Sequence, residues 1–171
     1  MNETLFQKEI YTLLSSKGYR VYSDKKYPKI GWFPQTFQGK KKPDLLVFHD
    51  FLKFKDVHNR CEKKRLPSPI GIELKLATSI KNITKGIINQ LDRKYKEEEY
   101  TCYQEQWKGK IPLLAFTTDR TYREGYFFGN CKFVLERFLW RMGIALIIKE
   151  GKYLNLSFEN QHIKLCKFEN G

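Results

Sequence analysis

The sequence predicts a mixed α/β domain in which helices flank a mixed β-sheet. Short apolar runs bounded by turn residues alternate along the chain with longer stretches whose apolar residues recur at helical spacing. The expected order is helix, strand, inserted hairpin, helix, strand, helix and hairpin, with no internal repeat or linker. The length of 171 residues suits one domain, and the 41 % of hydrophobic residues suffices for its core. We therefore expect a single domain over residues 1–171.

The first element is a helix over residues 3–17, with Asn2 as its N-cap and Gly18 as its stop. Glu3 projects near the middle of the apolar stripe of this helix, whereas Glu9 falls toward its edge. A carboxylate on a core-facing side is unusual unless it has a role. The alternative is that Glu3 complements the helix dipole and stays solvated. The stripe itself consists of Phe6, Ile10, Leu13 and Leu14.

Two apolar runs that carry acids organise the rest of the chain. Residues 42–48 and 70–76 each read as a buried strand, and a hairpin between them would bring Asp44 beside Glu73. Strand alternation places Lys75 on the same face as Glu73. Neighbouring carboxylates repel, and burial makes their ionisation costlier, unless a cation lies between them. A divalent ion with oxygen ligands, Mg²⁺ before others, is the simplest partner.

A lysine-rich segment precedes the first of these runs. Alternation predicts a strand at 19–22, and residues 24–42 then read as a loop. Its lysines would neutralise phosphates, and Trp32, Phe33 or Phe37 could stack on unpaired bases. A solvated loop with aromatic residues packed in the core is the alternative. The candidate nucleic-acid contacts in this segment are Lys25, Lys26, Lys29, Trp32, Lys40, Lys41 and Lys42.

A second basic stretch separates the two acid-bearing strands. It is longer than a tight hairpin needs, so the hairpin carries an insertion. A loop beside a reactive sheet edge is a suitable place to hold a substrate, although an insertion that only aids solubility fits equally well. The candidate contacts here are Lys53, Lys55, Arg60, Lys63, Lys64 and Arg65.

The remaining elements follow from periodicity. A helix over residues 80–98 would bury Ile80, Ile83, Ile87, Leu91 and Tyr95. Gln90 and Lys94 lie beside that stripe and would look toward the sheet edge. The other expected elements are a strand at 111–118, a short strand at 126–128, a helix at 133–142 with Val134, Phe138 and Met142 at helical spacing, and a hairpin that pairs 144–148 with 153–156.

Composition narrows the partners. The formal net charge of +13, from 32 Lys and Arg against 19 Asp and Glu, favours a polyanion, either nucleic acid or an anionic membrane surface. No apolar run approaches the roughly 20 residues of a spanning helix, so we expect no membrane partner. The N-terminus lacks the pattern of a signal peptide, and the four scattered cysteines fit reduced thiols better than a zinc site. These features favour a cytoplasmic protein.

The acid-bearing motifs resemble those of a known nuclease superfamily. Pro43-Asp44 and Glu73-Leu74-Lys75 resemble the signature of PD-(D/E)XK nucleases, and the element order is similar to their α-β-β-β-α-β core. Glu3, Gln7 and the Gln90 helix resemble VRR-Nuc domains, and archaeal Holliday junction resolvases share the same plan. The resemblance covers about residues 3–118 and implies a restriction-endonuclease-like core. Residues 119–171 would add a C-terminal helix and β-hairpin.

The resemblance implies a Mg²⁺-dependent endonuclease that hydrolyses phosphodiester bonds in DNA. It would act on junctions, flaps or branches during recombination, repair or replication. Asp44, Glu73 and the Leu74 carbonyl would hold Mg²⁺, with Mn²⁺ expected to substitute. Lys75 would hold the attacking water or stabilise the phosphorane, Glu3 would hydrogen-bond a water at the metal, and Gln90 would orient the nucleophile or a phosphate. A junction-cutting enzyme would also act as a homodimer or higher homo-oligomer.

Two other interpretations compete with the enzyme. The first is a catalytically inactive nuclease-like protein that only binds DNA. The second is an unrelated basic nucleic-acid-binding regulator, in which Glu73 and Lys75 form a surface ion pair of little energetic value. Cleavage assays with Mg²⁺ or EDTA distinguish the three.

Overall fold

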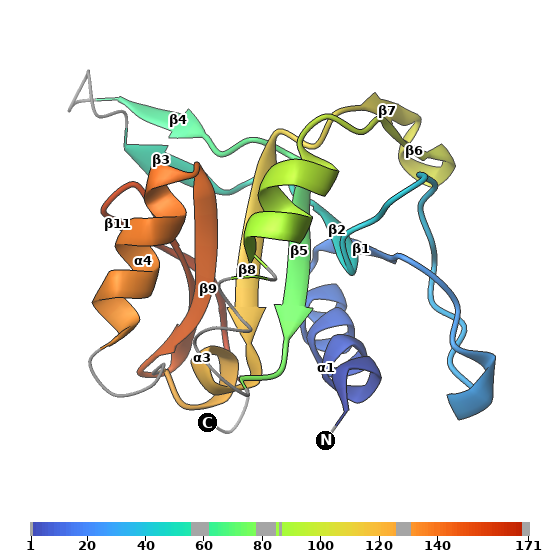
Figure 1. The fold of residues 1–171 in the computed structure, drawn as a ribbon, viewed down its shortest axis with the longest axis horizontal. Coiled ribbons are helices and arrows are strands. Elements are labelled where there is room, and N and C mark those ends of the chain that lie inside the picture. Colours follow the sequence, from blue (N-terminus) through green and yellow to red (C-terminus); the bar gives the residue numbers. More distant parts are fainter. Residues whose placement is uncertain (1, 56–61, 78–84, 86, 126–130, 169–171) are drawn as a thin grey trace.

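A seven-stranded mixed sheet forms the centre of the protein. The computed structural model describes residues 2–55, 62–77, 85, 87–125 and 131–168. The sheet confirms the predicted α/β class, and Figure 1 shows helices on its faces. In sheet order the strands are β1 (Arg20–Ser23), β2 (Leu45–Phe48), β5 (Ile70–Lys75), β8 (Leu113–Thr118), β9 (Ile144–Glu150), β10 (Tyr153–Phe158) and β11 (Gln161–Lys167).

Strand direction divides the sheet into two antiparallel parts joined by a parallel strand. β1, β2 and β5 pair antiparallel with one another, as do β9, β10 and β11. β8 runs parallel to both β5 and β9. Parallel neighbours need crossover connections, and helical segments follow β5 and β8 in the sequence. The expected pairing of the two acid-bearing strands is therefore present.

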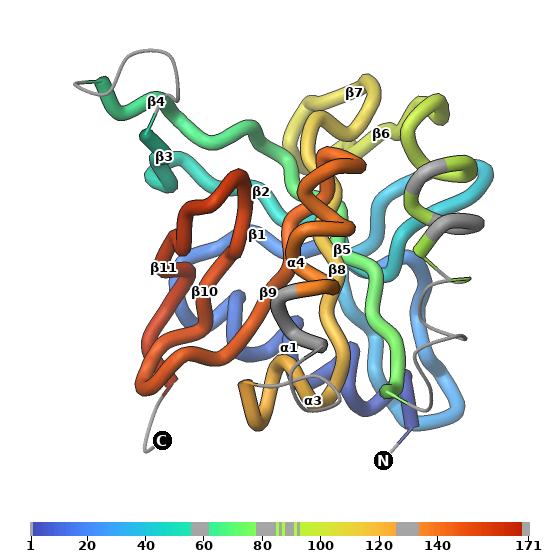
Figure 2. Tube along the Cα trace, turned by 60° about the vertical axis from the view of Figure 1, so that its left-hand side comes forward, coloured from blue at the N-terminus to red at the C-terminus, as the bar shows by residue number. Residues whose placement is uncertain are grey.

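The first helix, α1 (Glu3–Ser16), covers one face of the sheet. The Asn2 side chain caps it by accepting a hydrogen bond from the Leu5 N–H at 2.8 Å. Phe6, Ile10 and Leu14 are buried against β1, β2 and β5. The sheet curls, so that β10 and β11 contribute to the same core as α1 (Figure 2). This helix matches the expected one within a residue at its end.

The opposite face is covered by a π-helix, η2 (Ile87–Tyr95), and by α4 (Cys131–Arg141). The predicted stripe of η2 is buried at Ile87, Leu91 and Tyr95, whereas Ile80 and Ile83 lie outside the described residues. The stripe expected on α4 was one residue out of phase. Leu135 and Leu139 are buried, Phe138 and Met142 are only partly so, and Val134 is 69 % exposed.

Several small elements were not predicted. They are β6 (Tyr100–Cys102), η3 (Tyr103–Glu105), β7 (Trp107–Gly109) and α3 (Asp119–Arg123), together with the edge strand β11. Such short elements depend on distant contacts rather than on local periodicity. Tyr100, for example, is buried against Phe37, and Gln38 bridges to Thr101. The short strand expected at 126–128 lies outside the described residues.

The sheet has two ends that differ in what they carry. We call the end of β1, the start of β2 and the end of β5 the acid end, because Asp24, Asp44 and Glu73 lie there. The opposite end of these strands is the far end. The insertion joins the end of β2 to the start of β5, so it leaves the far end, where β3 (Lys53–Lys55) and β4 (Lys63–Arg65) form a separate ribbon (Figure 1). The interpretation of this basic stretch as a loop beside the reactive edge of the sheet is wrong, because the stretch lies at the other end of the strands.

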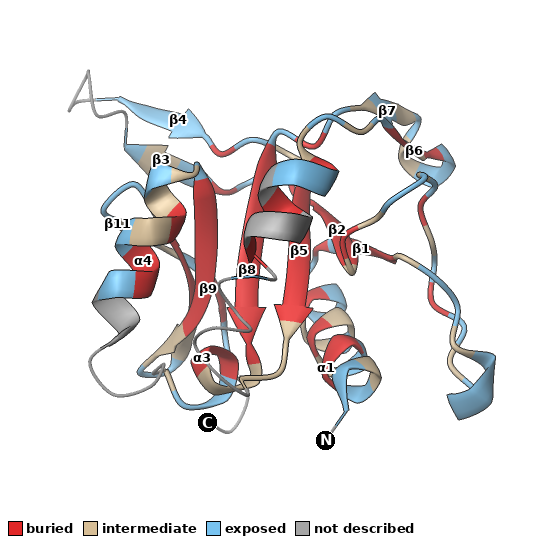
Figure 3. Ribbon diagram, in the orientation of Figure 1, coloured by how far each residue is buried: buried red, intermediate tan, exposed pale blue. Residues whose placement is uncertain are grey.

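The lysine-rich segment, by contrast, leaves the acid end. It connects β1 to β2 and contains a single turn of 3₁₀-helix, η1 (Pro28–Ile30). Figure 3 shows this turn exposed and standing apart from the buried sheet. Within the described ranges, no helix is long and apolar enough to cross a membrane. Cys102 and Cys166 are buried free thiols.

Candidate active site

Asp44 and Glu73 meet at the acid end. Asp44 directly precedes β2, and the register that pairs Leu45 with Ile72 brings Asp44 opposite Glu73. The Asp44 carboxylate accepts a hydrogen bond through Oδ2 from the Leu74 N–H at 2.7 Å. The pairing of the two acids that the sequence suggested is therefore observed.

Glu73 is buried and incompletely satisfied. It is 4 % exposed, and its Oε2 has no hydrogen-bond partner among the described residues. Lys75 lies on the same face, with its Nζ 3.8 Å from Glu73 Oε1, and its side chain is 25 % exposed. A buried carboxylate oxygen without a donor costs free energy. The site thus offers a strong acceptor that the described part of the protein does not fill.

Burial and mutual repulsion shape the ionisation of this pair. Burial raises the pKa of Asp44 to about 6, against the hydrogen bond from the Leu74 N–H, and the charges of Asp24 and Glu3 act in the same direction as burial. Burial also raises the pKa of Glu73 well above its usual range, and the Asp44 charge adds to this. Lys75 and the nearby Tyr95 hydroxyl lower that pKa, but by less. Two carboxyl groups in this arrangement favour a shared proton or a bound cation.

Gln7 holds the backbone of Asp44, a role that the sequence did not reveal. This side chain of α1 is buried, and its Nε2 lies 2.9 Å from each of three acceptors. The acceptors are the Ser23 hydroxyl, the Asp24 carboxylate and the Asp44 carbonyl. The Tyr27 hydroxyl donates to Gln7 Oε1 at 2.7 Å. The available signal was a polar residue directly beside Phe6 on the buried side of the helix.

Neither acid of α1 joins the pair directly. Glu3 is exposed, so the interpretation that it faces the core with the apolar stripe is wrong, and the alternative of a solvated carboxylate in the first turn of α1 is confirmed. Its charge still contributes to raising the pKa of Asp44. Glu9 forms an ion pair with Arg123 of α3. Gln90 belongs to η2, the helix that brings Tyr95 to Glu73, but its side chain lies outside the described residues.

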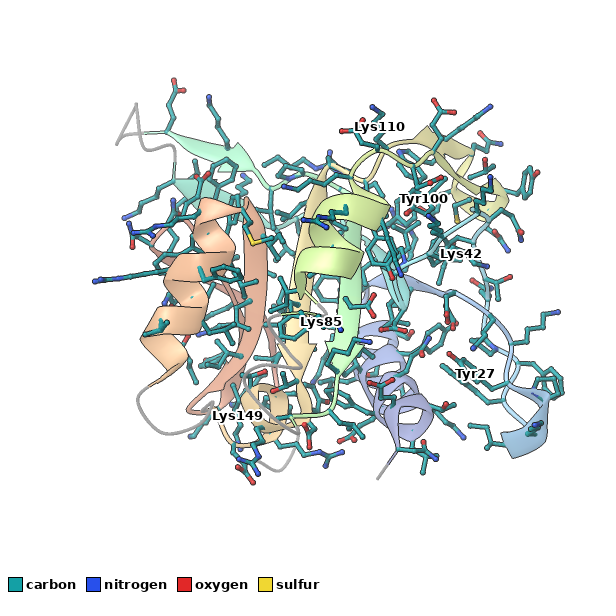
Figure 4. The ribbon with its side chains drawn as sticks, viewed as in Figure 1. Tyr27, Lys42, Lys85, Tyr100, Lys110 and Lys149 are labelled. Carbon is teal, nitrogen blue, oxygen red and sulfur yellow. The ribbon has the colours of Figure 1, made fainter. Side chains whose placement is uncertain are left out.

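The predicted basic contacts separate into two groups. Lys25, Lys26, Lys29, Lys40 and Lys41 are exposed in the segment that leaves the acid end. Lys42 is half-buried and donates to the Phe37 carbonyl at 3.3 Å, and Trp32 is half-buried against Tyr27 (Figure 4 labels Lys42 and Tyr27). At the far end, the exposed residues are Lys53, Lys55, Lys63, Lys64 and Arg65, while Arg60 lies outside the described residues.

The carboxylate oxygens of Asp44 and Glu73 are ligands of the kind that would suit a hard cation that keeps part of its hydration shell. No group of three or more His, Cys, Asp and Glu side chains converges to hold a metal in the part of the chain that the structure describes. Within the described ranges, Asp44 and Glu73 are therefore two carboxylates without a third side-chain ligand of these types. Mg²⁺ is commonly bound through one or two carboxylates and retains several waters. The unsatisfied Glu73 Oε2 is the atom that fits such an ion.

Comparison of this chain with protein-family models, with curated proteins and with solved structures finds no match.

Proposed function

We propose that this protein is a metal-dependent nuclease that hydrolyses phosphodiester bonds in DNA. The observation that carries the proposal is the pair of the half-buried Asp44 and the buried Glu73, in which one Glu73 carboxylate oxygen has no donor among the described groups. A divalent cation between the two carboxylates would offset their repulsion and satisfy that oxygen. In a protein of net charge +13, a polyanionic substrate fits such a site.

The arrangement of the elements supports a restriction-endonuclease-like core. When the short elements outside the main sheet (η1, β3, β4, β6, η3 and β7) are left aside, the order α1, β1, β2, β5, η2, β8 follows the α-β-β-β-α-β plan, and the four strands are neighbours in the sheet. Asp44 directly precedes β2 and Glu73 lies on β5, so both acids are at one end of the two central strands of this set. β9, β10 and β11 extend the same sheet beyond the core, and α4 packs on the face that η2 also covers.

Asp44, Glu73 and the Leu74 carbonyl would hold Mg²⁺, with Mn²⁺ as a substitute. When bound, such an ion supplies Lewis-acid stabilisation to a phosphodiester. The Leu74 N–H keeps Asp44 oriented toward the shared site by its 2.7 Å hydrogen bond. Lys75 places a positive charge beside Glu73, where it would hold the attacking water or stabilise negative charge that develops on the phosphate. Gln90 would orient the nucleophile from η2.

The proposed substrate is DNA of unusual structure, such as a junction, flap or branch. Support comes from the two basic surfaces, which lie at opposite ends of the sheet and so reach different parts of a substrate. Cleavage of a four-way junction would further require a homodimer, because two strands are cut symmetrically.

The test is cleavage of labelled duplex, flap, four-way junction and single-stranded DNA with Mg²⁺ or EDTA. We expect Mg²⁺-dependent cleavage that falls at least about a hundredfold in Asp44→Asn and in Glu73→Gln, since each removes several kcal/mol of charge stabilisation. Asp50→Asn is the matched control, because Asp50 is an exposed acid at the far end. Full activity of Asp44→Asn would refute the assignment.

The two-carboxylate donor set also favours a second candidate, a nuclease-like scaffold that binds DNA without cutting it. A third ligand of the usual types does not converge on Asp44 and Glu73 within the described residues. Under this alternative the wild-type protein binds the same DNA equally well in Mg²⁺ and EDTA, and cleaves none of it. The assay above separates the two candidates without further variants.

A further inference from the structure

Residues 25–33 form a protruding hairpin at the acid end, which we call the arm. Tyr27 and Trp32 pair through two backbone hydrogen bonds, of 2.9 Å and 3.1 Å. η1 closes the turn between them, and Gly31 takes the left-handed conformation (φ +66°) that ends it. Figures 1 and 3 show the turn extending from the body with an exposed surface. Such a projecting segment is available to a partner.

The base of the arm is fastened to the acid pair. The Tyr27 hydroxyl donates to Gln7 at 2.7 Å, and Gln7 in turn donates to the Asp44 carbonyl at 2.9 Å. The Asp24 N–H, at the root of the arm, donates to the same carbonyl at 2.9 Å. A ligand held by the arm would therefore lie on a segment that is hydrogen-bonded to the backbone of Asp44.

The aromatic residues of this region divide by exposure. Phe37 is fully buried in the core. The Trp32 ring stacks on Tyr27, with centroids 5.3 Å apart and planes at 16°, and it meets the edge of Tyr11. Phe33 is 66 % exposed, so its ring offers a free face to a partner. Of the three aromatic residues that could stack on a base, Phe33 is therefore the one whose ring is exposed.

The cationic residues of the arm surround a cavity of about 430 Å³ next to the start of α1. Lys25, Lys26 and Lys29 line it, together with Asn2 and Thr4 of the helix start. Among the described residues that line this cavity, none is acidic. Three positive charges around one concave surface suit the phosphates of a nucleic-acid strand.

We propose that the arm binds an unpaired nucleic-acid strand, with phosphates on Lys25, Lys26 and Lys29 and a base stacked on Phe33. This inference rests on the proposed function and names the feature that the site recognises. In a duplex each base is covered by its neighbours, so the exposed Phe33 ring finds no base face there. An unpaired base offers its face, and stacking of this kind does not depend on sequence.

The test measures binding in EDTA, where metal-dependent cleavage plays no part. Fluorescence anisotropy would follow a labelled single strand of about 16 nucleotides and the matching duplex. We expect Phe33→Ala to weaken single-strand binding roughly five- to hundredfold and duplex binding less than about twofold. Phe33→Tyr keeps a ring and should retain the affinity. Tyr103→Ala is the matched control, because Tyr103 is a 74 % exposed aromatic residue on η3, outside the arm.

The phosphate contacts have a separate readout. Changing Lys26 and Lys29 together to Gln should reduce the slope of log K against log salt concentration for single-strand binding. The expected reduction in its magnitude is about 1.4, at roughly 0.7 per phosphate contact. The proposal would be overturned if Phe33→Ala bound the single strand as tightly as wild type does. It would also be overturned if this variant lost as much affinity for the duplex as for the single strand. Loss of single-strand binding in Phe33→Ala, with no cleavage by wild type in Mg²⁺, would support the arm and refute the nuclease. Cleavage by wild type with unchanged binding by Phe33→Ala would do the reverse.

Discussion

The two basic stretches of the chain leave opposite ends of the same pair of strands. The arm and the lysines that follow it lead into β2 at the acid end, beside Asp44. The ribbon of β3 and β4 follows β2 and lies at the far end, away from both acids. The two stretches look alike in the sequence, because each is rich in lysine and neighbours one acid-bearing strand. Their positions nevertheless give them different access to the site.

The ends also differ in how their polar groups are satisfied. At the far end, Arg20 and Arg65 pair with the exposed Asp50, an arrangement that water would replace at little cost. At the acid end, Glu73 is buried, and among the described residues one of its carboxylate oxygens has no hydrogen-bond partner. A cation would therefore satisfy a buried oxygen at the acid end, whereas Asp50 at the far end is already paired. This difference is what the following predictions test.

The largest effect is expected at Lys75. In Lys75→Met the positive charge beside Glu73 is lost, and we expect cleavage in saturating Mg²⁺ to fall about 10²- to 10³-fold, as for other preorganised stabilising groups. Lys53→Met, at an exposed lysine of the far end, should stay within about twofold of wild type. Equal losses in the two variants would remove the distinction between the ends.

The next effect is the pH dependence of stability. The pKa of Asp44 is about 6 in the folded protein, above its ordinary value of 3.8. Folding therefore favours the protonated form, so the stabilising contribution is complete below the ordinary pKa and is lost as pH rises through about 6. In EDTA, wild type should lose up to roughly 3 kcal/mol relative to Asp44→Asn between about pH 4 and pH 8, at about 1.4 kcal/mol per pKa unit. Urea unfolding of both proteins measures this, and parallel profiles would contradict it.

Two glutamines provide a comparison of intermediate size. Gln7 bridges Asp24, Ser23 and the Asp44 carbonyl from a buried position, while Gln161 bridges the backbone N–H and carbonyl of Lys55 at the far end. Gln7→Leu should cost about 1–3 kcal/mol, because it removes a buried amide that makes several hydrogen bonds within the protein. Gln161→Leu removes exposed hydrogen bonds and should cost less. Thermal unfolding distinguishes them at roughly 2–4 °C per kcal/mol, and equal shifts would show that burial at the acid end has no special weight.

The smallest effect concerns the far-end lysines. Changing Lys53 and Lys55 to Gln should weaken duplex binding only modestly. The slope of log K against log salt concentration should fall in magnitude by up to about 1.8, at about 0.9 per phosphate contact. The cleavage rate at saturating DNA should not change, because these residues lie away from the acids. A fall in that rate comparable with the effect at Lys75 would place the ribbon in the catalytic machinery.

The strands that carry the candidate site were predictable from the sequence, because they depend on local periodicity. The strands around Asp44 and Glu73, their pairing, and the shared face of Glu73 and Lys75 all follow from alternation. The position of the insertion also follows from topology. Asp44 precedes the first strand of the pair and the insertion follows that strand, so the two must lie at opposite ends of it.

Other features of the site depend on contacts that periodicity does not encode. Helical spacing places Glu3 near the apolar stripe, but it cannot show that the buried part of α1 begins only at Phe6. It also cannot show that Gln7 reaches a carbonyl more than thirty residues away in the sequence. Phe33 and Phe37 are equally plausible stacking residues in the sequence, and only the packing of Phe37 on Tyr100 separates them.

The central claim, that Asp44 and Glu73 together bind a divalent cation, is tested most directly by titrating the protein with Mn²⁺ and following the free ion by electron paramagnetic resonance. At about pH 8, where the ion can displace any proton on the two carboxyl groups into the solvent, wild type and Asp50→Asn should bind Mn²⁺ alike. The double variant Asp44→Asn, Glu73→Gln should lose that binding, and Mg²⁺ should displace Mn²⁺ from wild type. Mn²⁺ binding by the double variant equal to that of wild type would contradict the account.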